Sequence, residues 1–291
     1  MIGSPFLFSA LLIWALSSGC GDGKTPAAST PNPTVPDSTV IPYNLNQPDA
    51  AFALPPELLE ISGLATIDST RLAAVQDERG VIYVLDRETA QILSEGRFRG
   101  NGDYEGIEVV DDFAWMLRSD GFLYSAEEIV QPDTESARYD LDLHANCDAE
   151  GLALDERAHR LLIVCKENPG RGLGRSRAIY AFDLLTLRRF EAPVYLIDRQ
   201  QLDVHGNLFK PSALAIHPRS GYVYVLSSVR KMLIVIDPDH PGQIREMRAL
   251  PERLFPQPEG LTFFPDGTLF IANEGVNGPA TLLRFDEQIA R

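Results

Sequence analysis

Three Glu–Gly pairs are the residues of this chain whose type and setting most directly suggest chemistry. Glu105, Glu150 and Glu259 each precede a glycine that opens a short apolar segment. Further acidic and amide side chains follow apolar segments at Asp77, Glu78 and Asn273. Carboxylate and amide oxygens are the ligands that Ca²⁺ prefers, in sets of about six to eight. If the fold brings these side chains together, they form a cation site or a network of compensated charges.

Other kinds of site have little support in the sequence. The five His residues are scattered, and no CxxC or Cys/His zinc spacing occurs, which argues against zinc and copper. The chain also has no Gly-x-Ser-x-Gly elbow and no P-loop. Oxygen chemistry around the glutamates is therefore the main hypothesis.

The elements that must position these glutamates repeat along the chain. A Gly–Leu or Gly–Ile pair, replaced once by Ala–Leu, opens a short apolar strand that is followed by a turn and two further strands. The copies are centred on Gly63, Gly106, Gly151, Ala213 and Gly260, at spacings of 43, 45, 62 and 47 residues. Antiparallel strands repeated at this period are typical of propeller blades.

Five copies predict an all-β fold, a five-bladed β-propeller over residues 43–291. Six blades are the alternative, because the third unit is long. The fifth copy ends after its third strand, so we expect residues 43–45 to supply the missing outer strand and close the ring, which removes an exposed edge.

In a propeller, the first strand of each blade lines the central channel. The residues before the repeated glycine or alanine should therefore surround one mouth of that channel: Ser62, Glu105, Glu150, Ser212 and Glu259. Converging carboxylates repel one another and resist ionisation unless they are compensated. Arg118 and Lys166 could compensate them in a purely structural network. A bound Ca²⁺ is the alternative that we favour.

Short motifs spread over residues 43–275 carry a family resemblance. They are YNL at 43–45, EISGL at 60–64, QDE at 76–78, GDYEG at 102–106, RSDG at 118–121, KPSA at 210–213 and QPEG at 257–260. Together they resemble the signature of the SdiA-regulated family. The resemblance implies a five-bladed propeller, distantly akin to NHL-repeat proteins, with a calcium site. It makes Glu105, Glu150 and Glu259 the first candidates for metal ligands, and Asp77, Glu78 and Asn273 the second.

The first 42 residues differ in composition from the rest. Residues 6–16 are apolar except for Ser9, and small residues lead to Cys20, which predicts a signal peptide over residues 1–20 with a lipobox-like end. Residues 21–42 are rich in Pro, Thr and Ser, as expected for a linker. We expect a cell-envelope protein that is lipid-anchored through Cys20 and faces the periplasm or the outside. An ordinary signal peptide with an incidental cysteine is the alternative.

The charge balance bears on partners. The chain has 26 Lys and Arg against 41 Asp and Glu, a net charge of -15, which disfavours nucleic acids and anionic membrane surfaces. We expect a monomer that contacts the membrane only through its anchor and binds an unidentified small molecule or protein. The alternative is a calcium-dependent hydrolase acting on a lactone, an ester or a phytase-like phosphate substrate.

Two cysteines remain in the folded part, Cys147 and Cys165. An exported protein meets conditions in which a disulfide can form. We expect two buried free thiols, with a disulfide between neighbouring strands as the alternative.

Overall fold

The computed structural model describes most of the chain from residue 40 onward. The described residues are 40–127, 129, 136–143, 147–174, 176–202 and 209–288, with only the backbone of Arg199. The predicted signal peptide, Cys20 and the linker up to residue 39 lie outside them. No helix among the described residues is long and apolar enough to cross a membrane.

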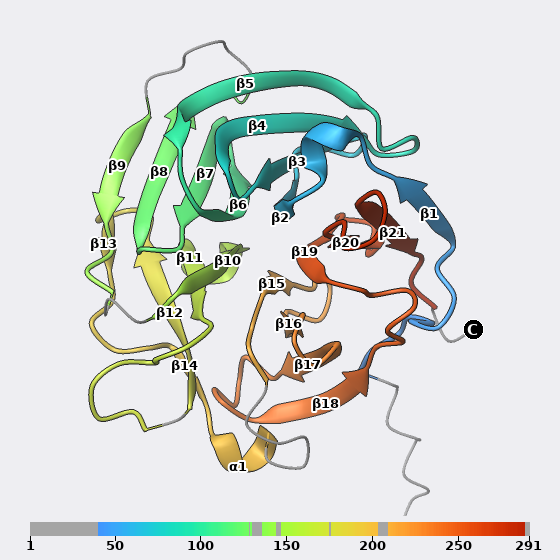
Figure 1. The fold of residues 1–291 in the computed structure, drawn as a ribbon. Coiled ribbons are helices and arrows are strands. Elements are labelled where there is room, and N and C mark those ends of the chain that lie inside the picture. Colours follow the sequence, from blue (N-terminus) through green and yellow to red (C-terminus); the bar gives the residue numbers. More distant parts are fainter. Residues whose placement is uncertain are drawn as a thin grey trace, which may run out of the picture. The chain divides into compact units, whose positions relative to one another are not determined.

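Five small antiparallel sheets are arranged about a central axis (Figure 1). The architecture is a five-bladed β-propeller, which confirms the predicted fold. The sheets, from the inner to the outer strand, contain β2 (Ile61–Thr66), β3 (Arg71–Gln76), β4 (Arg79–Asp86) and β5 (Ile92–Asn101); β6 (Tyr104–Val110), β7 (Phe113–Arg118), β8 (Phe122–Glu127) and β9 (Ala137–Asp140); β10 (Ala149–Asp155), β11 (Arg160–Cys165) and β12 (Arg177–Asp183), with β13 (Arg188–Arg189) and β14 (Tyr195–Ile197) both paired to β12; β15 (Ala213–Ile216), β16 (Val223–Ser227), β17 (Met232–Ile236) and β18 (Ile244–Ala249); and β19 (Pro258–Phe263), β20 (Leu269–Asn273), β21 (Thr281–Phe285) and β1 (Ala50–Ala53).

Helical structure is confined to three short segments. They are the 3₁₀ turns η1 (Pro56–Leu58) and η2 (Glu156–Ala158) and the single-turn helix α1 (Arg199–Leu202). The fold is therefore built almost wholly from strands and turns.

The ring is closed by β1, which pairs antiparallel with β21 in the register Ala50 to Arg284. The prediction that residues 43–45 supply this strand is wrong. Tyr43 and Leu45 are buried against the cores of the last two blades, and the Tyr43 hydroxyl donates a hydrogen bond to the Gly267 carbonyl at 2.7 Å. These apolar residues therefore fill space between blades, and the chain reaches the edge of the sheet a few residues later.

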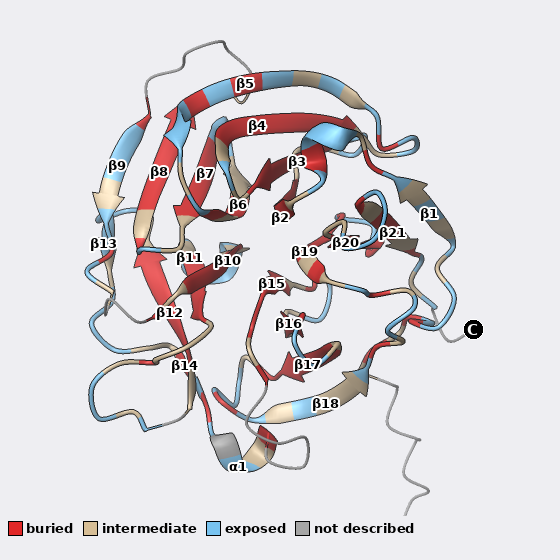
Figure 2. Ribbon diagram, in the orientation of Figure 1, coloured by how far each residue is buried: buried red, intermediate tan, exposed pale blue. Residues whose placement is uncertain are grey.

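The core lies between neighbouring blades. Second and third strands are almost entirely buried, whereas the outer strands β5 and β18 alternate between half-buried and exposed residues (Figure 2). Strands buried on both faces read as continuous apolar runs, and outer strands with one face in water alternate. This pattern explains why the inner strands could be located from the sequence.

The repeated glycine is required by close approach at the axis. A Cβ atom on Gly63 would lie 2.9 Å from the Cα of Gly106, and one on Gly151 would lie 2.9 Å from the Cα of Ala213. A side chain at either position would collide with the backbone of the next inner strand. The glycine thus permits the first strands of adjacent blades to pack closely around the channel.

Cys147 and Cys165 form a disulfide, so the expectation of two free thiols is wrong. Strands β10 and β11 pair Ala149 with Cys165, and the backbone N–H of Glu167 donates to the carbonyl of Cys147 at 3.0 Å. This pairing holds the segment before β10 against the end of β11. The disulfide therefore fixes the segment that leads directly to Glu150.

Candidate cation site at the channel mouth

The near mouth is the end of the channel at which the five first strands begin. β-Bulges occur there in four blades, where the register of the first strand slips between Ile61 and Gly63, Tyr104 and Gly106, Glu150 and Leu152, and Pro258 and Gly260. A bulge leaves a residue outside the ladder and re-aims its side chain. Ser62, Glu105 and Glu259 are such residues, and Glu150 lies directly before the bulge in β10.

The two serines of the ring connect neighbouring blades. The Ser62 hydroxyl donates to the Tyr104 carbonyl at 2.6 Å, and the Ser212 hydroxyl donates to the Pro258 carbonyl at 2.8 Å. Both serines are buried. They satisfy backbone carbonyls at the free inner edges of the next first strands, where no ladder partner exists. The role of Ser62 in the ring is structural, whereas Ser212 also hydrogen-bonds to the Glu259 carboxyl and opposes the rise in its pKa.

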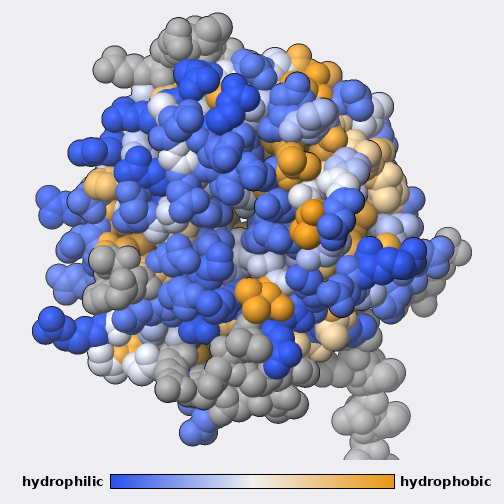
Figure 3. Space-filling model, in the orientation of Figure 1, coloured by the Kyte–Doolittle hydropathy of each residue, from blue (hydrophilic) through white to orange (hydrophobic). Residues whose placement is uncertain are grey.

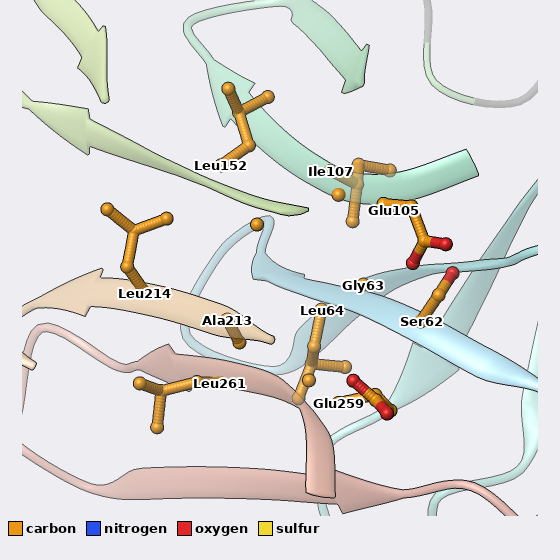
Figure 4. A pocket seen from close by; sticks show the side chains of 13 residues that line it. Ser62, Gly63, Leu64, Glu105, Ile107, Leu152, Ala213, Leu214, Glu259 and Leu261 are labelled. Carbon is orange, nitrogen blue, oxygen red and sulfur yellow. The ribbon is translucent and has the colours of Figure 1, made fainter. Parts of the chain in front are cut away.

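The three glutamates differ in their surroundings. Glu150 is buried, with 1% of its surface exposed, and its carboxylate lies 2.5 Å from the Lys166 ammonium. Glu105 and Glu259 are partly buried and line a narrow cavity of about 10 Å³, which is room for about one water molecule. Figure 4 shows both of these carboxylates with the Ser62 side chain at one end of the cavity.

The pKa values of all three carboxyls are raised. Burial raises the pKa of Glu105 most, and the neighbouring Glu150 and Asp103 carboxylates raise it further. Burial also raises the pKa values of Glu150 and Glu259, although the Lys166 ammonium acts in the opposite direction on each. The near mouth therefore holds more negative groups than it can keep ionised without another positive charge.

The predicted ligands of the second set, Asp77, Glu78 and Asn273, differ in burial and in hydrogen bonding. Burial, and then Glu60 and Glu274, raise the pKa of Asp77 to about 6, and its buried Oδ1 has no hydrogen-bond partner. Glu78 is exposed.

Asn273 is fully buried and is held by the blade itself. Its amide nitrogen donates to the Leu254 carbonyl at 3.2 Å and to the Thr281 hydroxyl at 3.0 Å, which leaves its Oδ1 without a partner. Asp77 and Asn273 each offer an unpaired oxygen, and Glu78 contributes only charge near the rim.

The donor set can be compared with what a cation needs. No group of three or more His, Cys, Asp and Glu side chains in the part of the chain that the structure describes is spaced to hold a metal ion. The chemistry of the set nevertheless fits a hard cation, because it consists of carboxylate and amide oxygens, two of them buried and unpaired.

The two predicted compensating cations, Lys166 and Arg118, have different partners. Lys166 pairs with Glu150, as the structural network requires. Arg118 instead pairs with Asp120 at 2.6 Å, outside the ring of glutamates. One of the two predicted cations thus lies at the ring, where it pairs with Glu150 and also lowers the pKa of Glu259.

Sequence comparison identifies the family of the chain. A family model described as SdiA-regulated matches residues 58–285. The chain belongs to the SdiA-regulated family. No curated protein sequence matches it.

Solved structures share the fold of this family member at low sequence identity. The Myxococcus xanthus glutaminyl cyclase matches with a TM-score of 0.61 and 15% identity, over 84% of this chain and 97% of the cyclase. A PQQ-bound aldose sugar dehydrogenase from Streptomyces coelicolor has a TM-score of 0.54 and 12% identity, over 82% and 97%. A luciferin-regenerating enzyme gives 0.52 and 12%, over 84% and 98%. These likenesses concern the fold alone.

The structure adds Asp103 to the predicted residues of the site of this SdiA-regulated propeller. The Ser119 hydroxyl lies 2.5 Å from the Asp103 carboxylate, and Asp103 helps to raise the pKa of Glu105. Both residues belong to the family motifs at 102–106 and 118–121, so the signal was present in the sequence. The missing information was which motif residues face the glutamates.

Proposed function

We propose that this SdiA-regulated propeller is a calcium-binding module of the cell envelope that binds a small molecule or a protein at the near mouth. The observation that supports it is the convergence of Glu105, Glu150 and Glu259 on one mouth, where Lys166 pairs with only one of them. A bound divalent cation would supply the missing positive charge. Glu105 and Glu259 would hold it, with Asp77 as a further ligand.

A loaded near mouth would have a defined chemistry. The cation would attract carboxylate, phosphate or carbonyl oxygens of a ligand, while Lys166 would hold the Glu150 side chain in place. The polar surface around the axis is compatible with such a partner, since the face seen in Figure 3 is mostly hydrophilic.

The experiment is thermal unfolding of the chain from residue 40 onward, first in EDTA and then with increasing calcium. We expect a saturable rise in Tm, because a ligand that binds only the folded state stabilises it. Glu105→Gln should weaken this response at least about tenfold, because it removes a charged ligand. Glu95→Gln, which changes an exposed residue of β5, is the matched control. An unchanged Tm in metal-free protein would overturn the calcium site.

The cell-envelope location is also part of the proposal. It rests on the apolar stretch at residues 6–16 and on Cys20 at its small-residue end. The anchor is tested by fractionating cells that express either the unmodified chain or its Cys20→Ser variant. If Cys20 carries the anchor, the variant should be lost from the membrane fraction. Equal membrane recovery of both chains would contradict it.

A second candidate function is calcium-dependent hydrolysis. The observation that favours it is that Glu105 has Glu150 as a neighbour, which pairs with Lys166, since a carboxyl with a raised pKa can donate a proton and a cation can stabilise an oxyanion. The calcium-loaded protein would be assayed with lactones and phosphate esters. Turnover that is lost in Glu105→Gln would favour catalysis, and its absence across the panel would favour binding alone.

A further inference from the structure

The far mouth, at the end of the channel where the five first strands finish, contains a much larger cavity. Its volume is about 560 Å³, within the range of about 300–1,000 Å³ typical of small-molecule sites. Each of the five inner strands contributes residues to its wall. They include Thr66, Glu108, Leu154, Ile216, His217 and Phe263.

Glu108 is the fixed polar group of this cavity. Its Oε1 accepts a hydrogen bond from the backbone N–H of Val109 at 3.0 Å, and its Oε2 accepts one from the N–H of Leu154 at 2.9 Å. The carboxylate therefore bridges the free edges of β6 and β10. No ion pair of Glu108 is found among the residues that the structure describes. Both oxygens retain lone pairs for a ligand.

The other charged groups around the cavity are accounted for separately. Asp68 pairs with Arg71 at 2.7 Å, and Asp155 pairs with Arg160 at 2.9 Å. Glu156 and Arg157 are exposed at the rim. Glu108 is thus the carboxylate of the wall that a ligand could neutralise.

The remaining wall supplies apolar surface and a neutral imidazole. Leu154, Ile216 and Phe263 line the cavity. His217 also lines it, is 3% exposed, and accepts a hydrogen bond at Nδ1 from the backbone N–H of Ser220. Its Nε2 has no hydrogen-bond partner and lies 3.7 Å from the Glu287 carboxylate. Burial lowers the pKa of His217 to about 4, so it is uncharged at neutral pH and does not repel a cation.

Hydroxyl groups lie on two neighbouring inner strands of the wall, β2 and β19. The hydroxyls of Thr66 and Thr262 are 3.4 Å apart, and Thr66 donates to the Phe263 carbonyl at 3.1 Å. Thr262 joins β19 to the wall of the same cavity. A ligand would therefore meet one carboxylate, hydroxyl groups and an apolar surface.

We propose that the far mouth is a binding site for a small organic cation, whose protonated amine pairs with Glu108 and whose apolar body packs against Ile216 and Phe263. The site is independent of calcium at the near mouth. An anionic ligand is disfavoured, because the wall presents acidic groups and the chain carries a net charge of -15.

The probe for this site is 2-phenylethylamine, which combines an amine with an aromatic ring, and phenylacetate is the anionic control. Binding is measured by calorimetry on the chain from residue 40 onward, in EDTA. We expect saturable binding of the amine and none of the acid. Glu108→Gln should weaken it at least about tenfold, because a hydrogen bond to a charged group contributes about that much affinity.

Matched variants separate this site from general charge effects. Glu95→Gln removes an equal charge at an exposed position of β5, outside the cavity, and Glu150→Gln removes one at the near mouth; both should bind the amine as the unmodified chain does. Ile216→Trp places a bulkier side chain in the apolar wall and should weaken binding without removing a charge, so it also serves if Glu108→Gln does not fold.

The pH dependence is a second measurement on the unmodified chain. Burial raises the pKa of Glu108 to about 7, and the Glu156 carboxylate acts in the same direction while the N–H groups of Val109 and Leu154 oppose the rise. Binding should therefore strengthen between about pH 6 and about pH 8 as the carboxylate ionises. Absence of saturable amine binding, equal binding of phenylacetate, or full affinity in both Glu108→Gln and Ile216→Trp would overturn the proposal.

Discussion

The near mouth and the far mouth are formed by opposite ends of the same five strands, yet they differ in charge and in space. At the near mouth, bulges turn Glu105 and Glu259 toward a cavity of about 10 Å³. At the far mouth, the same strands end around a cavity of about 560 Å³ with Glu108 in its wall. Excess negative charge in little space suits an ion, whereas a single carboxylate beside apolar surface suits an organic cation. Two residues of one strand can therefore serve different sites, as Glu105 and Glu108 of β6 do at the near and far mouths.

The largest effect that separates the mouths should come from removing the disulfide. In Cys147→Ala/Cys165→Ala we expect a loss of about 3 kcal/mol in the free energy of unfolding, the value for closing a loop of this length. Because the disulfide fixes the segment before Glu150, calcium affinity should fall while amine binding at the far mouth persists. Urea unfolding measures the loss of stability, and calorimetry measures the binding of calcium and of the amine. Unchanged calcium affinity would show that the near mouth does not depend on this link.

A smaller effect is expected when the near-mouth ion pair is broken. Lys166→Met leaves Glu150 buried without its cation and should cost about 2 kcal/mol of stability in EDTA, since a buried charge that loses its partner is destabilising and Lys166 is partly exposed. The double variant with Glu150→Gln should recover most of this loss. If Lys166→Met alone unfolds like the unmodified chain, the pair does not compensate Glu150 and the charge comparison fails.

The smallest effect is the dependence of stability on pH. The folded pKa of Glu108 is about 7 against 4.5 for an unperturbed glutamate, so the folded state binds more protons in this window and stability should fall as pH rises through it. We expect about 1 kcal/mol from Glu108, allowing for solvent screening. Glu105, Glu150 and Glu259 act in the same direction, because their pKa values are also raised.

Calcium and the Glu108→Gln variant should show how much each mouth contributes to the dependence of stability on pH. Calcium should flatten the part that the near mouth contributes, and Glu108→Gln should remove the part from the far mouth. Urea unfolding at a series of pH values, with and without calcium, gives both. Stability that rises with pH in EDTA would contradict the raised pKa values at either end.

The blade repeat could be predicted because its signals are local. The glycine that opens each first strand is required by close approach at the axis, and the apolar runs that follow are buried on both faces. The near-mouth glutamates could be predicted for the same reason, since each stands beside that glycine. Their exact separations could not, because side-chain directions depend on bulges that the sequence does not mark.

Other features depend on contacts between distant residues. Closure by β1 was missed because Ala50–Ala53 is a short alanine-rich strand at the outer edge, where little is buried. The disulfide depends on the register of β10 against β11. Glu108 was missed because it lies inside an ordinary strand, and its role appears only when Leu154 of the next blade donates to it.

The pairing of β1 with β21 has a consequence for how the chain reaches this state. Ala50 lies in the first strand of the propeller and pairs with Arg284 in the last one, so the ring can close only after every blade has been made. Contacts between such distant residues form slowly. Before β1 pairs with it, β21 presents an unpaired edge to any neighbouring chain. The rate of this last step, rather than the depth of the core, should set how prone the new protein is to aggregate.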